Sequence, residues 1–212
     1  MVTPAADGSL LLPVGHYVAG QGQEHWVRIG ARTTRIRDDE TANVWWLAHG
    51  LTDQATPWTA QAVREHAGLP ADRFAEAMAE LRAAGLLCEV DPADDVAAER
   101  FARRHRLHPL QPGLGAHPQL PGWYAIGLPD LPAAVVVPPF AFEVWQWAPA
   151  LDSLWHACEA VAVLEDEAAD PDDPAAADDA EPLSVLTDLL YCLHPLLAGH
   201  AAYLDERIGD PV

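Results

Sequence analysis

One short tryptophan-containing pattern occurs twice in this chain, once in each half. Residues 26–30 read WVRIG and residues 123–127 read WYAIG. In the same order, residues 44–48 read VWWLA and residues 144–148 read VWQWA. A pattern that returns in order at a long spacing indicates an internal repeat, in which each copy is one small folded unit. Such a duplication is more typical of a recognition scaffold than of a single catalytic cleft.

The length and composition allow two such units. The chain has 212 residues, of which 50% are hydrophobic and 21% are charged, which is enough for two domains of roughly 80–100 residues each. No apolar stretch approaches the roughly 20 residues of a membrane-spanning helix. Residues 1–12 hold no lysine or arginine, so the charged start of a secretory signal is missing. We therefore expect a cytoplasmic protein.

The balance of charge restricts the possible partners. The formal net charge is −20, and all twelve basic residues are arginine. Affinity for nucleic acid comes mostly from basic side chains that displace counterions from phosphates, and a strongly acidic protein repels a duplex. The composition therefore disfavours nucleic acid. Two groups of arginines nevertheless stand out, namely Arg28, Arg32, Arg35 and Arg37, and Arg100, Arg103, Arg104 and Arg106.

The sequence offers no clear catalytic or metal-binding pattern. No Ser-His-Asp arrangement, glycine-rich phosphate loop or carboxylate pair can be placed, so we expect neither enzyme activity nor a cofactor. The three cysteines lie in apolar runs and are expected to be buried thiols. His105, His108 and His117 have a spacing near that of metal ligands. They lie in a proline-rich segment without nearby cysteines, so chance is the better explanation.

The first half predicts three strands, three helices and a final strand. Alternating residues broken by glycines predict an antiparallel meander over 16–18, 24–29 and 32–37. Acidic residues at 38–40 are typical of a helix start, and Gly68 is typical of a helix end. The expected helices span residues 40–49, 57–67 and 70–85, and the final strand spans residues 86–90.

The rest of the chain is divided by composition. Residues 1–13 are expected to be a flexible N-terminus, residues 14–92 the first domain, and residues 93–121 a proline- and arginine-containing linker. The second domain would span residues 122–208. Within it, residues 165–181 hold nine acids and no bulky apolar side chain, which predicts a disordered insertion. The other elements expected there are a strand at 133–137 and helices at 140–148, 151–164 and 183–197.

Two stretches of the first half resemble known families. Gly68-Leu69-Pro70 between two helices, followed by ELRAAGLL at 80–87, resembles a winged-helix domain. Residues 31–45, which read ARTTRIRDDETANVW, together with the closing His49-Gly50, resemble the PqqD-like family of recognition elements for ribosomal peptide precursors. The resemblance covers about residues 16–90 and extends weakly to 122–205. It implies an α+β fold of two tandem winged-helix-like domains, each a small antiparallel sheet plus three helices.

The PqqD-like resemblance also implies a binding site. Members of the family take a leader peptide as an added strand on the sheet, beside the third helix, which agrees with the physics of strand addition. Carried onto this chain, the edge strand would be residues 32–37, and its arginines would suit an acidic peptide. The alternative is a solvated sheet face whose arginines pair with acids at 38–40. The candidate peptide-binding residues are Arg28, Arg32, Thr34, Arg35, Arg37, Arg73, Ala77 and Glu80.

The expected function is recognition without catalysis. We expect an adaptor that binds a peptide, such as a precursor leader, or a protein partner in a peptide-modification pathway. One alternative is a winged-helix transcriptional regulator, supported by the arginines at 100–106. Another is a structural adaptor subunit of a larger complex. The recurring tryptophans are expected in the core or at the seam between the domains rather than in a binding platform.

Overall fold

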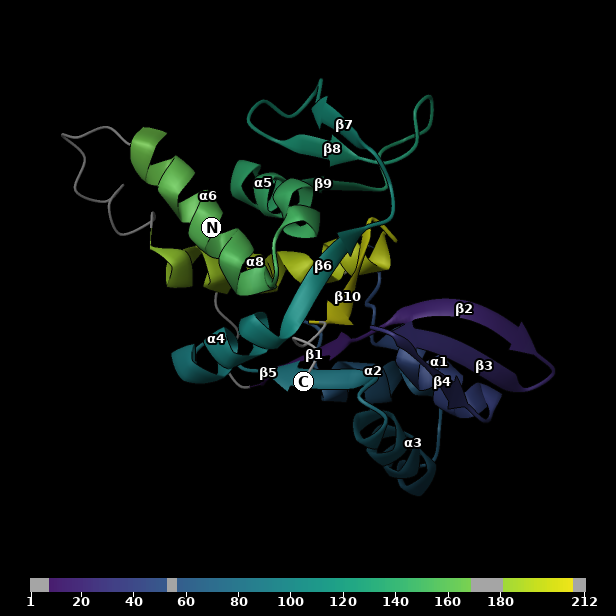
Figure 1. Ribbon diagram of the computed structural model, residues 1–212. Coiled ribbons are helices and arrows are strands. Elements are labelled where there is room, and N and C mark those ends of the chain that lie inside the picture. Colours follow the sequence, from purple (N-terminus) through teal and green to yellow (C-terminus); the bar gives the residue numbers. More distant parts are fainter. Residues whose placement is uncertain (1–7, 53–56, 169–180, 208–212) are drawn as a thin grey trace.

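The computed structural model describes residues 8–52, 57–168 and 181–207, and its helices and small antiparallel sheets make an α+β fold (Figure 1). In chain order the elements are β1 (Leu10–Pro13), β2 (His16–Gln21), β3 (Glu24–Ile29), β4 (Arg32–Ile36), α1 (Asp39–Leu47), α2 (Ala60–Ala67), α3 (Ala71–Ala83), β5 (Leu87–Val90), α4 (Asp95–Arg104), β6 (His105–Pro109), β7 (Gly113–Ala116), β8 (Tyr124–Ile126), β9 (Val135–Val137), α5 (Pro139–Trp147), η1 (Ala148–Ala150), α6 (Leu154–Ala168), α8 (Pro182–Ala198) and β10 (Ala202–Glu206).

The two halves of the chain repeat one topology. In the first, β2, β3 and β4 form a sheet, three helices follow, and β5 returns to pair with β1. In the second, β7, β8 and β9 form the sheet, α5, α6 and α8 follow, and β10 returns to pair with β6. The described pairings are all antiparallel. The internal repeat predicted from the tryptophan pattern is therefore present, strand for strand.

The expected boundaries are wrong in two places. Residues 10–13 form the buried strand β1 instead of a flexible tail, because their leucines pack into the cores; residues 1–7 lie outside the described part. Residues 93–121 are not a linker, since they hold α4, β6 and β7. Of the prolines in this segment, Pro109 ends β6, Pro112 directly precedes β7, and Pro118 and Pro121 lie in turns between β7 and β8. The second repeat begins at β6. Of the predicted insertion at 165–181, residues 169–180 lie outside the described part, and α6 continues to Ala168.

Local sequence signals explain where the helices of the first repeat begin. The Asp38 carboxylate accepts from the Thr41 amide at 2.8 Å and caps α1. The Thr59 hydroxyl caps α2 in the same way, through the Ala62 amide at 3.3 Å. Such caps satisfy amides that have no partner within the helix. α2 ends at Gly68, whose φ of 65° favours glycine. The helices predicted from these signals are confirmed to within a few residues.

The ribbon of β1 and β5 lies between two hydrophobic cores. Leu11 belongs to the core of the first repeat, whereas Leu10 and Leu12 belong to the core of the second. Alternate residues of a strand point to opposite faces, so β1 contributes to both cores at once. The helix α4 adds Ala98 and Phe101 to the second core. The two repeats are therefore packed as one unit around β1.

Two equivalent tryptophans anchor the first helix of each sheet-and-helix unit. Trp45 in α1 is 1% exposed, and its indole Nε1 donates to the Val14 carbonyl. Trp145 in α5 is 5% exposed, and its Nε1 donates to the Ala201 carbonyl at 3.1 Å. A buried indole N–H needs such a partner. The expectation of a core position is confirmed for these two side chains, while Trp123 is 44% exposed.

A buried carboxylate joins the strand β10 to the turn between β3 and β4. The Asp205 Oδ1 atom accepts from the Gly30 amide at 2.6 Å and from the Glu206 amide at 2.9 Å. We expect Asp205→Ala to lower the free energy of unfolding by about 1–3 kcal/mol, because the Gly30 amide loses its acceptor. Asp205→Asn keeps an oxygen there and should lose less. Urea unfolding of the two variants checks this, and equal losses would contradict it.

Candidate functional site

The predicted arginine strand does lie at the edge of a sheet. Within the described sheets, β4 pairs with β3 alone and leaves its other side open. Ile36 points into the core, while Arg32, Arg35 and Arg37 are exposed. The predicted edge strand is therefore present at Arg32–Ile36. Its arginines, however, are mostly engaged within the molecule.

Two of the predicted arginines connect the first repeat to β10. The Arg32 guanidinium donates to Glu206 Oε1 at 2.9 Å and to the carbonyl of Ala84, the residue after α3, at 3.2 Å. The Arg28 Nη2 atom donates to the Tyr203 hydroxyl at 2.8 Å. Both acceptors from β10 are more than 170 residues away in the sequence. These arginines therefore bridge the two repeats at their surface.

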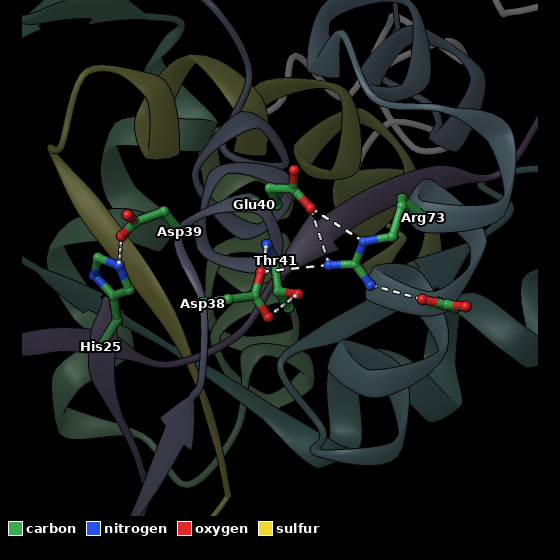
Figure 2. Close-up of polar contacts among 7 residues, drawn as sticks. His25, Asp38, Asp39, Glu40, Thr41 and Arg73 are labelled. Carbon is green, nitrogen blue, oxygen red and sulfur yellow. Dashed lines mark hydrogen bonds and ion pairs between the residues drawn. The ribbon is translucent and has the colours of Figure 1, made fainter. Parts of the chain in front are cut away.

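Arg73 lies in the first turn of α3, at the opposite end of this helix from the contact between Arg32 and Ala84 (Figure 2). Its guanidinium donates to Glu76 Oε2 at 2.6 Å and to Glu40 Oε2 at 3.1 Å. It also lies 3.6 Å from the Asp38 carboxylate that caps α1. Glu76 first, and then Glu40, raise the pKa of this guanidinium. Arg73 thus ties the beginning of α3 to the beginning of α1.

The other candidates of the first repeat do not form a shared cationic surface. Arg35 pairs with Glu24 at 2.9 Å, and Thr34 accepts a hydrogen bond from Arg32 at 3.4 Å. Ala77 is 1% exposed and packs in the core, so the expectation that it faces a ligand is wrong. Glu80 is exposed. Among the candidate arginines, Arg37 alone has no hydrogen bond or ion pair to another part of the chain that the structure describes.

A different surface, in the second repeat, has the shape of a binding groove. A cavity of about 530 Å³ lies between β9 and α8, within the range of small-molecule and peptide pockets. β9 contributes Val136 and Val137, and α8 contributes Tyr191 and Cys192. The remaining lining residues are Trp123, Pro138, Phe140, Asp188 and Pro195. We call this cavity the β9–α8 groove.

The β9–α8 groove has the position in its repeat that the candidate site has in the first. β9 is an edge strand, because it pairs with β8 alone among the described strands. Gly199, directly after α8, lies so close to Ala134 that an added Cβ would stand 2.9 Å from the Ala134 carbonyl oxygen. This contact fixes the spacing of α8 and β9 at one end. None of the binding residues predicted from the sequence lies in this groove.

A second, much smaller cavity lies at the seam between the repeats. Its volume is about 60 Å³, and His16, His49 and His200 line it together with Trp45 and Trp46. Burial lowers the pKa of His49 to about 4. The volume leaves room for little more than water. We therefore assign this cluster to the packing of the seam and not to ligand binding.

Neither the cysteines nor the suspected histidines form a reactive centre. Burial raises the pKa of Cys88 to about 11, and that of Cys158 and Cys192 to about 12. Thiols of this kind are poor nucleophiles. His105 contacts Cys88 Sγ at 3.5 Å and the Phe101 carbonyl at 2.8 Å. Within the described residues, no cluster of three or more histidine, cysteine or acidic side chains could hold a metal ion.

Comparison with known proteins found no matching family model, no matching curated protein and no matching solved structure. Within the described part of the chain, no helix has the length and apolar character needed to cross a membrane.

Proposed function

We propose that this protein is a non-catalytic recognition module that binds an extended segment of a peptide or protein partner as an added strand. The β9–α8 groove carries this proposal. An exposed strand edge offers unpaired backbone groups, and pockets beside it can accept alternate side chains of a bound segment. The groove combines an edge strand with apolar walls in this way. We further propose that the two repeats are winged-helix-like domains of the PqqD-like type, which would place the groove beside the third helix.

In this proposal the first repeat stabilises the second and does not itself bind the peptide. Its own third helix, α3, is tied to neighbouring elements by Arg32 at one end and by Arg73 at the other. The side chains of Arg32 and Arg73, which were expected to contact a peptide, are already engaged in these contacts. We therefore assign the first repeat to stabilising the second. A leader peptide in a modification pathway is one partner that this arrangement would suit. A segment of a larger assembly is another.

The surface of α3 argues against the alternative of a transcriptional regulator. A winged-helix regulator places its third helix in the major groove. Here α3 exposes Asp72, Glu76 and Glu80, and its Arg73 is ion-paired. Such a surface repels phosphates, which supply most of the affinity for a duplex. We therefore propose a peptide or protein partner and not DNA.

Selection from a random peptide library tests the proposed function. The full-length protein is immobilised, and displayed peptides of about a dozen residues are enriched over successive rounds. We expect enrichment that Trp123→Ala reduces at least tenfold, since truncating a central aromatic anchor commonly costs that much or more. Trp147→Ala is the matched control. Trp147 lies in the same repeat and is 46% exposed, against 44% for Trp123, but does not line the groove.

The comparison of the variants separates binding in the groove from non-specific adsorption of peptides. Peptides enriched equally on the wild type and on Trp123→Ala would show that the groove binds nothing. No enrichment above background on the wild type would reject the proposed function altogether. The two tryptophan variants should unfold at the same urea concentration as each other, because both side chains are about half exposed.

A further inference from the structure

We infer that two copies of this protein associate through the β7–β8 hairpin, with β7 of one copy lying antiparallel to β7 of the other across a twofold axis. This name denotes residues 112–132, which hold β7, β8 and the turns beside them. The inference goes beyond the proposed function and does not depend on it. β7 and β9 lie at opposite edges of their sheet, so a dimer formed through β7 leaves the edge of β9 open.

The hairpin is an exposed surface with almost no charge. Outside β8 and Gly127 most of its residues are exposed, and Asp130 is its single charged residue, although 21% of the whole chain is charged. A surface that stays in water usually carries charged side chains at roughly a quarter or more of its positions. Charged residues are depleted at the centre of protein interfaces. The composition of the hairpin is therefore that of a covered contact surface.

Exposed apolar side chains are concentrated on this hairpin. Four leucines are between 39% and 60% exposed, namely Leu114, Leu120, Leu128 and Leu131. The first lies within β7, the second in the turn that leads to β8, and the last two in the loop after β8. At the start of that loop the Gly127 amide donates to the carbonyl of Pro112, directly before β7, at 3.1 Å. Exposed apolar groups in one region typically mark an interaction surface.

The hairpin is held against the rest of the second repeat. An added Cβ at Gly113 would stand 2.9 Å from the Cζ atom of Phe142 in α5, so β7 lies directly on this helix. In the turn, the His117 amide donates to the Trp123 carbonyl at 2.7 Å, and the Trp123 amide donates to the Leu120 carbonyl at 3.1 Å. The surface is therefore formed before any partner arrives, and association requires little ordering of the chain.

β7 is an open sheet edge that carries no charge. It pairs with β8 alone among the described strands, and it is the outermost strand of its sheet in Figure 1. Its four residues, GLGA, include neither a charged residue nor a proline. By contrast, the edge strand β4 exposes Arg32 and Arg35, and charges of this kind oppose pairing with another chain. The unpaired backbone groups of β7 can therefore accept a further strand.

Charge and symmetry favour a second copy as the partner. Each chain has a net charge of −20, so two copies repel one another except where the touching surfaces are nearly free of acids. The hairpin meets this condition. Two identical edge strands related by a twofold axis run antiparallel, as all the described strand pairs of this protein do. The dimer joins two sheets into one, in the order β9, β8, β7, β7, β8, β9.

Sedimentation equilibrium of the full-length protein over a wide range of concentrations tests the inference. We expect a reversible dimer with twice the 22.9 kDa mass of the chain. Raising the NaCl concentration should tighten this dimer, because salt screens the repulsion between two chains of charge −20. A dimer held by ion pairs would loosen instead, and that result would overturn the inference.

A matched pair of substitutions assigns the dimer to β7. Leu114→Glu adds an acid within β7 of each copy, and we expect it to raise the dissociation constant at least tenfold, because like charges repel across an interface. Val18→Glu adds the same acid at a 56% exposed position of β2, an edge strand of the first repeat. It should change the dissociation constant by no more than about twofold. Urea unfolding confirms that both variants are folded.

Hydrogen exchange gives a test that needs no substitution. The amides of residues 113–116 should exchange more slowly at high protein concentration than at low concentration, because the second copy covers the edge of β7. The amides of Arg32–Ile36, at the charged edge of the first repeat, should exchange equally fast at both concentrations. This comparison stays valid if Leu114→Glu does not fold.

The inference and the proposed function can fail separately. A monomer at every concentration would overturn the inference. So would a dimer that leaves the β7 amides unprotected, or one that Leu114→Glu weakens no more than Val18→Glu does. None of these results bears on the peptide selection by the β9–α8 groove. A dimer with protected β7 amides, together with an unenriched peptide library, would reject the proposed function and leave the inference standing.

Discussion

Mild acidification is expected to destabilise this protein strongly, through two buried histidines at the seam between its repeats. His49 is 8% exposed, and its Nδ1 atom lies 3.1 Å from the Trp45 carbonyl. His194 is 3% exposed, and its Nε2 atom lies 2.8 Å from the Leu11 carbonyl of β1. Burial lowers the pKa of each imidazole from 6.5 to about 4, despite these hydrogen bonds.

The direction of the effect follows from proton binding. An unfolded chain takes up a proton on each histidine as the pH falls through about 6.5, whereas the folded protein does so only near pH 4. Between these values the unfolded state binds more protons than the folded state, so the free energy of unfolding decreases as the pH decreases. Each histidine should contribute a loss of about 3 kcal/mol over this window. Burial lowers the pKa of His16, His105 and His108 too, which acts in the same direction.

Urea unfolding at pH 7.5 and at pH 4.5 measures this loss. Gln in place of His194 can still donate from the position of Nε2, and Asn in place of His49 can donate from the position of Nδ1, yet neither amide titrates. Each of His194→Gln and His49→Asn should therefore lose about 3 kcal/mol less than the wild type on acidification. His66→Gln, at an exposed position in α2, is the control. Parallel losses in all four proteins would contradict the assignment.

The sequence alone predicts the order of the elements from β2 to β5, and of β9 and the helices α5, α6 and α8, because local signals carry it. The two tryptophan patterns mark equivalent strands and helices in each repeat, and the caps at Asp38 and Gly68 mark helix ends. β1 was not predicted, because its leucines do not alternate with polar residues. A strand with a core on each face needs no polar side, so its pattern resembles neither a surface strand nor a recognisable helix.

The candidate site could not be read from sequence spacing in the same way. The arginines of β3 and β4 suggested a free cationic edge, yet Tyr203, the partner of Arg28, and Glu206, the partner of Arg32, lie at the other end of the chain and meet them only after folding. The β9–α8 groove combines a three-residue strand with a helix that follows a long acidic segment. No local motif joins these two pieces. Trp123 was visible as a repeated tryptophan, but its exposure is a property of the fold.

Removing single leucines from β1 is expected to destabilise both repeats together. Leu11 and Leu12 are 0% exposed and face the first and the second core, respectively. Leu11→Ala and Leu12→Ala should each lower the free energy of unfolding by about 2–5 kcal/mol, through lost burial and the cavity left behind. Val18→Ala, at a 56% exposed position of β2, should change it by less than about 0.5 kcal/mol. Urea unfolding gives these values.

Native-state hydrogen exchange then shows whether the repeats unfold as one. If β1 couples the cores, Leu12→Ala must weaken amide protection in α1 of the first repeat as much as in α8 of the second, although Leu12 belongs to the second core. Protection lost in α8 alone would mean that the repeats open independently and that β1 is only a neighbour to each. Equal loss in both is the result we expect, because a strand whose alternate side chains fill two cores cannot leave one without leaving the other.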